Sequence, residues 1–328
     1  MAAARPRSRH ENGGPVPLHP QVDVLLQQLA QAEGPRFETL PPAEARAIFT
    51  GLAHLDPGED VAHVEDRTVP GPGGEIPVRI YAPITPEGVA PTGVVLFLHG
   101  GGFVVGDLDT HDGTCRMLAN RSGAIVVAVH YRLAPEAPAP AALEDGMAVL
   151  QWLPDHAAAL GATTAKIGVI GDSAGGNLAA LVCQRARDVG GPDLALQVLV
   201  YPATDLTMGH PSIDENGEGY FLTKRAMAWF MGLYLGESGG MDPKDPIVSP
   251  LFIDSCVGLP PAVVITAEFD PLRDEGEAYA ERLRDDGVAV ESIRYDGQIH
   301  GFFGMSAILD DARDAIDRAG AALGEALA

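Results

Sequence analysis

The stretch KIGVIGDSAGGNLAALVCQRARD at residues 166–188 decides the fold. Its first five residues form a short apolar run that predicts a strand, and residues 174–188 predict an apolar helix. Between them stands Gly-x-Ser-x-Gly, with the serine at position 173. Glycines on either side of a serine allow a strand-to-helix turn so tight that a Cβ would clash with neighbouring backbone. A glycine-rich helix start is the plainer interpretation, but the flanking strand and helix favour a nucleophile at Ser173, next to a helix N-terminus that stabilises negative charge.

Strands and helices alternate on both sides of this stretch. Residues 93–98 and 124–130 are continuous β-branched runs, typical of strands buried on both faces of a parallel sheet. We therefore expect an α/β fold with a mostly parallel central sheet and helices on both faces. The other expected strands are 76–82, 194–201, 262–267 and 288–295, and the other expected helices are 140–153, 223–235, 273–286 and 306–326.

Two parts of the chain do not fit the alternation. Amphipathic helices at 21–32 and 42–55 come before any strand, and the polar, aromatic passage 205–240 interrupts the pattern. We expect both to form a helical cap over the carboxyl edge of the sheet, where open α/β sheets bind ligands. The expected organisation is N-terminal cap helices at 1–55, a first core part at 56–204, a cap insertion at 205–240 and a second core part at 241–328.

Composition excludes several classes of partner. The 328 residues include 22 Lys and Arg against 45 Asp and Glu, a formal net charge of −23. Without a concentrated basic patch, such a chain repels nucleic acids and anionic membrane surfaces. The three cysteines are widely spaced, which indicates neither a disulfide framework nor a metal site. No apolar h-region follows the N-terminal charges, so we expect a cytoplasmic protein. We also expect no bound metal or organic cofactor.

A second glycine-rich motif, His99-Gly100-Gly101-Gly102, directly follows the strand at 93–98. Three consecutive glycines lose much conformational entropy on folding. This cost is understandable where backbone N–H groups must approach a ligand closely, as in an oxyanion hole. A flexible turn is the alternative, but a plain turn rarely needs three glycines behind a buried strand.

These motifs resemble those of the bacterial hormone-sensitive-lipase-like (family IV) esterases, a branch of the α/β-hydrolase superfamily. The resemblance covers about residues 75–305 and implies the α/β-hydrolase fold. It implies Ser173 as nucleophile, Asp270 as the triad acid and His300 as the base. It also implies an oxyanion hole formed by the backbone N–H groups of Gly101, Gly102 and Ala174. The segments that carry it are HGGG at 99–102, YRLAPE at 131–136, GDSAGG at 171–176, EGYFLT at 218–223, DPLRDEG at 270–276 and HGF at 300–302.

Chain order supports the same three side chains independently. Serine, acid and histidine follow one another as α/β-hydrolases require. Asp270 and His300 each come after a predicted strand, which places them on the same sheet edge as Ser173. Asp274 and Glu275 are the nearest alternative acids, but both fall inside the following helix.

The expected function is that of a serine carboxylesterase acting on small-molecule esters. The resemblance implies short- to medium-chain acyl esters, an acyl-enzyme intermediate and a possible homodimer. Other acyl hydrolases on the same triad (an amidase, a lactonase or a carbamate hydrolase) remain open. A non-catalytic receptor or a scaffold protein is disfavoured, because all three triad residues are present. The aromatic candidates for the substrate pocket are Phe103, Tyr220, Phe221, Trp229 and Phe230, although such spacing is also typical of plain packing.

Overall fold

A single eight-stranded sheet organises the computed structural model, which describes residues 16–32, 34–51, 55–236 and 240–328. The strands lie in the order β1-β2-β4-β3-β5-β6-β7-β8. The first two pair antiparallel, β2 runs antiparallel to β4, and all other pairs are parallel. The strands are β1 (His63–Gly71), β2 (Gly74–Ala82), β3 (Val94–Leu98), β4 (Ile125–Val129), β5 (Ile167–Asp172), β6 (Leu194–Val200), β7 (Ala262–Phe269) and β8 (Val290–Ile299).

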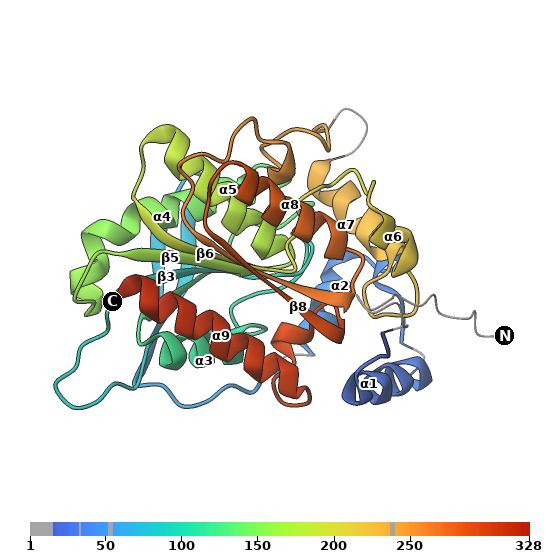
Figure 1. Ribbon diagram of the computed structural model, residues 1–328, viewed down its shortest axis with the longest axis horizontal. Coiled ribbons are helices and arrows are strands. Elements are labelled where there is room, and N and C mark those ends of the chain that lie inside the picture. The colour runs from blue at the N-terminus through green and yellow to red at the C-terminus, as the bar shows by residue number, and fades with distance from the viewer. Residues whose placement is uncertain (1–15, 33, 52–54, 237–239) are drawn as a thin grey trace.

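Helices cover both faces of the sheet (Figure 1). The strands β3, β4 and β7 are buried along their whole length, which explains their continuous apolar runs. The expected α/β fold with a mostly parallel sheet is therefore confirmed. One face carries α4 (Ala141–Leu160), α5 (Ala174–Val189) and α8 (Arg273–Asp285), and the other carries α3 (Asp112–Ser122) and α9 (Asp310–Leu327).

Several elements differ from the expected ones. The helix α4 continues past Pro154 to Leu160, whereas the prediction stops at residue 153. It continues because Leu153 and Ala157, on the same face, are buried in the core. The strand β1 and the helix α3 were not expected, since both are polar in sequence. Antiparallel pairing with β2 forms β1, of which only Val69 is buried.

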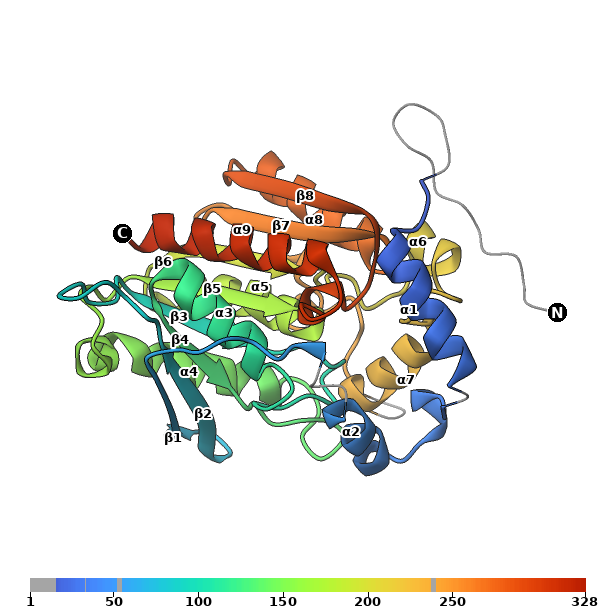
Figure 2. The same ribbon diagram turned by 90° about the horizontal axis from the view of Figure 1, so that it is seen from below.

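Four helices gather at the end of the sheet where β5, β7 and β8 finish (Figure 2). They are α1 (Pro20–Gln31), α2 (Pro42–Thr50), α6 (Pro211–Glu215) and α7 (Lys224–Leu235). The 3₁₀ turn Phe37–Thr39 lies against α7, so the N-terminal segment and the 205–240 passage are in contact. Residues 1–15, 33, 52–54 and 237–239 of the two expected cap parts lie outside the described residues. No described helix combines the length and apolar character needed to cross a membrane.

Candidate active site

Ser173 occupies the turn between β5 and α5 with φ 56° and ψ −117°, a conformation that is strained for a residue other than glycine. Its N–H donates to the Val200 carbonyl at 2.8 Å, which fixes the turn against β6. The turn is close to the neighbouring backbone: a Cβ on Gly175 would lie 1.9 Å from the Leu98 carbonyl oxygen. Packing thus holds the strained serine at the end of the strand, as the motif predicts.

Replacing Gly175 by alanine is expected to lower the free energy of unfolding by about 3 kcal/mol, because the new methyl group meets backbone that cannot turn aside. Gly190, at the other end of α5, is the control: its φ is +65°, but nothing lies within 4 Å of an added Cβ. The Gly190→Ala variant should lose only about 1 kcal/mol. Urea unfolding of both variants checks this, and equal losses would contradict it.

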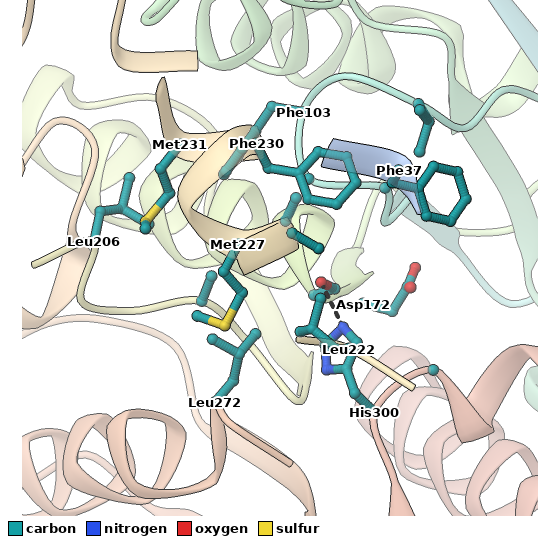
Figure 3. Close-up of a pocket in the computed structure, with 18 of the residues that line it drawn as sticks. Phe37, Phe103, Asp172, Leu206, Leu222, Met227, Phe230, Met231, Leu272 and His300 are labelled. Carbon is teal, nitrogen blue, oxygen red and sulfur yellow. Dashed lines mark hydrogen bonds between the residues drawn. The ribbon is translucent and has the colours of Figure 1, made fainter. Parts of the chain in front are cut away.

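His300 and Asp270 form a hydrogen-bonded series with Ser173. His300 Nε2 lies 2.9 Å from Ser173 Oγ, and its Nδ1 lies 2.7 Å from Asp270 Oδ2. Asp270 follows β7 and His300 follows β8, so the same edge of the sheet supplies all three side chains. Figure 3 shows His300 at the cavity wall. This geometry suits a serine whose proton passes to an oriented imidazole.

Two further interactions hold the Asp270 segment. The Oδ1 atom of Asp270 accepts the Leu272 N–H at 2.8 Å, which fixes the plane of the fully buried carboxylate. Its backbone carbonyl accepts from Asn216 Nδ2 at 3.1 Å. Asn216 directly follows α6 in the predicted cap passage, so this passage braces the acid from outside the sheet. Nothing in the sequence motif indicates that role for Asn216.

The alternative acids have other partners. Asp274 accepts from the Ser212 N–H at 2.9 Å and from the Arg273 guanidinium at 2.8 Å. Glu275 accepts the N–H groups of Thr204 and Asp205, and burial raises its pKa well above the ordinary range. Neither is hydrogen-bonded to His300, so the structure separates Asp270 from its neighbours in the motif.

The glycine loop after β3 lies beside the serine. Gly101 and Gly102 have φ of 118° and 58°, values that side chains rarely tolerate. A Cβ on Gly102 would come within 2.3 Å of the Phe230 ring. Gly101, Gly102 and Ala174 all border the cavity at Ser173, and their backbone N–H groups have no acceptor among the described residues. These donors are available to a ligand oxygen, which is what an oxyanion hole requires.

Comparison with known proteins places the chain in a family. Residues 95–304 match a family model described as alpha/beta hydrolase fold. The chain is 47% identical to the carboxylic ester hydrolase LipN of Mycobacterium tuberculosis over 268 residues, covering 80% of this chain and 70% of LipN. It is 45% identical to the esterase LipI of the same organism over 299 residues, covering 91% of this chain and 93% of LipI. The chain belongs to the hormone-sensitive-lipase-like (family IV) esterases.

Solved structures agree with this assignment. An ester hydrolase from the metagenome of Lake Arreo, complexed with a derivative of bipyridine phosphonate, has a TM-score of 0.88 at 42% identity. That match covers 94% of this chain and 98% of the other. A hyperthermophilic esterase from Pyrobaculum calidifontis has a TM-score of 0.84 at 44% identity, with 94% and 98% of the two chains covered. The protein is a carboxylic ester hydrolase.

The cavity of the esterase, which Ser173 helps to line, is mainly apolar (Figure 3). Three parts of the chain enclose it: the N-terminal segment, the glycine loop after β3, and the passage that includes α7. The bulkiest apolar side chains around it are Phe37, Phe49, Phe103, Leu206, Phe221, Leu222, Met227, Phe230, Met231 and Leu272.

The sequence-predicted pocket residues divide into two groups. Phe103, Phe221 and Phe230 line the cavity, whereas Tyr220 and Trp229 do not. Tyr220 is buried, with its ring centroid 4.9 Å from that of Phe269. Trp229 borders a separate groove on the outer side of α7. The rotation of α7 about its axis thus places Phe230 at the cavity and Trp229 at the groove. We therefore omit Tyr220 and Trp229 from the candidate pocket.

The esterase also has a largely buried ion pair next to Ser173 that the motifs did not reveal. Asp172 accepts the Gly100 N–H at 2.8 Å and lies 3.4 Å from His111 Nε2. Burial opposes the charge on both groups, but their mutual attraction prevails: it lowers the pKa of Asp172 and raises the pKa of His111. Asp172 thus links the turn at Ser173 both to the glycine loop and to the residue before α3. Burial lowers the pKa of nearby His99 to about 3, so His99 is neutral, and its Nδ1 contacts the Gly100 carbonyl at 2.7 Å.

His111 is expected to make stability depend on pH. Because its pKa is raised by folding, its contribution is complete below about pH 6.5 and is lost as the pH rises through the folded value. His111→Leu should cost about 3 kcal/mol at pH 6, since it leaves the buried Asp172 without its partner. The difference from the wild type should narrow towards pH 9.

Urea unfolding between pH 6 and pH 9 measures this difference. His156→Gln is the control, because His156 is hydrogen-bonded to the Trp152 carbonyl and stacked on the Trp152 ring, away from any carboxylate partner among the described ion pairs. Its unfolding free energy should run parallel to that of the wild type. A constant gap between His111→Leu and the wild type over the same range would contradict the role given to the pair.

Proposed function

We propose that the esterase uses Ser173, His300 and Asp270 as a catalytic triad to hydrolyse short- to medium-chain acyl esters. The observation that supports this best is the hydrogen-bonded series from Asp270 through His300 to Ser173, at 2.7 Å and 2.9 Å, beside an apolar cavity. The likeness to proteins named as esterases supports the same reaction class.

In the proposed first step, His300 Nε2 accepts the Ser173 proton while Oγ attacks the ester carbonyl carbon. The Nδ1–H of His300 donates to Asp270, which selects the required tautomer and stabilises the imidazolium that forms. The N–H groups of Gly101, Gly102 and Ala174 then bind the oxyanion of the tetrahedral intermediate. His300 returns the proton to the leaving alcohol, and an acyl-Ser173 intermediate remains.

The second step repeats this chemistry with water. His300 accepts a proton from the water as its oxygen attacks the acyl carbon, and the proton then returns to Ser173 Oγ as the acid departs. The three side chains thus carry out every proton transfer and acyl transfer of this cycle, and the backbone N–H groups stabilise the oxyanions.

We further propose that residues 1–55 and 205–240 act as the cap that limits the substrate. The described parts of both segments contribute to the cavity walls: Phe37 and Phe49 from the first, Met227 and Phe230 from the second. Such enclosure favours small esters and disfavours long-chain triglycerides at an oil–water interface.

The test is kcat/KM for p-nitrophenyl esters from acetate to palmitate. We expect the maximum between acetate and hexanoate. A maximum at dodecanoate or longer would contradict the proposed substrate class. The p-nitroanilides of the same acyl chains, measured in parallel, would reveal amidase activity if the triad hydrolyses amides.

A further inference from the structure

The cavity at Ser173 and the groove on the outer side of α7 are separated by two side chains, Leu206 and Met231, which belong to the walls of both. We propose that this partition sets the limit on chain length, and that opening it leads an unbranched alkyl chain of the ester into the outer groove. The proposal rests on the proposed esterase function and names the part of the site that selects its substrates.

The two residues of the partition differ in how firmly they are held. Leu206 is only 5% exposed, and its N–H donates to Ser249 Oγ at 2.8 Å, so its position is fixed. Met231 is half-buried on α7, and its unbranched thioether side chain has several accessible rotamers. Figure 3 shows the two side chains next to each other on the side of the cavity away from Phe37. Met231 is therefore the movable part of the wall.

The outer groove is suited to an alkyl chain. Its side chains are almost all apolar, and none of the described residues that border it is charged. An aliphatic chain that enters it therefore displaces water from apolar surface, and each buried methylene strengthens binding about fourfold. The residues that border only the groove include Met208, Trp229, Leu233, Leu235 and Met241.

Met227 offers a matched comparison on the same helix. It is also a methionine and lines the cavity, but it does not border the outer groove. Shortening Met227 enlarges the cavity alone, whereas shortening Met231 joins it to the groove. The two variants remove the same atoms from the same helix, one beside the cavity alone and the other beside both the cavity and the groove.

The experiment compares Met231→Ala with Met227→Ala in two ester series. One varies the acyl chain of p-nitrophenyl esters from butyrate to dodecanoate, and the other varies the alcohol of straight-chain alkyl acetates from butyl to dodecyl. We expect Met231→Ala to raise the ratio of kcat/KM for the ten-carbon over the four-carbon chain at least tenfold in one series. Met227→Ala should change it less than about threefold. The series that responds identifies whether the acyl or the alkoxy chain uses the partition.

A second substitution tests occupancy of the groove itself. Trp229 borders the groove but not the cavity. In the Met231→Ala background, Trp229→Asp places a charge on the path of the alkyl chain of the substrate. It should therefore reverse the gain in the ratio of kcat/KM for the ten-carbon over the four-carbon chain. Met231→Val provides a smaller opening should the alanine variant fail to fold. The proposal would be overturned if Met231→Ala left the ratio unchanged in both series, or if Met227→Ala changed the ratio equally. It would also be overturned if the gain persisted after Trp229→Asp.

The proposed function can fail separately from this proposal. If Ser173→Ala retains wild-type hydrolysis of the butyrate ester, the proposed function is wrong whatever the ratio does. If butyrate hydrolysis depends on Ser173 and the ratio does not move, only the role of the partition is wrong.

Discussion

Replacing Ser173 by alanine is expected to reduce kcat for p-nitrophenyl butyrate by about 10⁵- to 10⁶-fold. The substitution removes the oxygen that lies 2.9 Å from His300 Nε2, and with it the acyl-enzyme route. A small rate above that in water should remain, because the oxyanion donors and the cavity are still present. Steady-state hydrolysis with a burst-phase measurement of the wild type checks both parts.

A second serine controls for general damage. Ser255 does not line the cavity, and its hydroxyl is bonded to Asp286, so Ser255→Ala should retain wild-type turnover within about twofold. The melting temperature of Ser173→Ala should also stay close to that of the wild type. A fall of less than tenfold in kcat for Ser173→Ala would rule out this serine as the nucleophile.

Replacing Asp270 by asparagine is expected to reduce kcat by about 10⁴-fold. Asparagine keeps the size of the side chain and can still accept the Leu272 N–H, so the segment should stay folded. It can also donate its amide hydrogen to His300 Nδ1, which would leave the wrong ring nitrogen protonated and remove the charge that stabilises the imidazolium. The kcat for p-nitrophenyl butyrate, measured on folded variants, tests this.

Asp274→Asn is the matched control for the acid. Asp274 belongs to the same motif, but it is bonded to Ser212 and Arg273 instead of His300. Its substitution should change kcat by less than about fivefold. If Asp274→Asn proved as damaging as Asp270→Asn, the hydrogen bond to His300 would not explain which acid matters.

The sequence predicts the residues at the sheet edge well because local rules determine their positions. Gly175 is required by the approach of Leu98, and the motif around Ser173 expresses that requirement directly. Asp270 and His300 each follow a buried strand, and parallel strands end at one edge. Chain order and the positions of the strand ends were therefore sufficient to predict that these three residues, distant in sequence, meet at one edge of the sheet.

The walls of the cavity could not be predicted in the same way. Whether Trp229 or Phe230 faces the cavity depends on the rotation of α7 about its axis, which tertiary packing sets. Phe37 and Phe49 reach the cavity from the N-terminal segment, and no local pattern distinguishes them from ordinary core residues. The pairing of Asp172 with His111 likewise joins the end of β5 to the residue before α3, 61 positions apart in the chain.

The most direct test is to locate the covalent adduct formed with a fluorophosphonate. Peptide mapping by mass spectrometry should place one phosphonyl group per chain on the peptide that contains Ser173, with loss of esterase activity in proportion to labelling. The Ser173→Ala variant should take up none. Inactivation with the adduct on another residue, or full activity after complete labelling of Ser173, would contradict the assignment of Ser173 as the nucleophile.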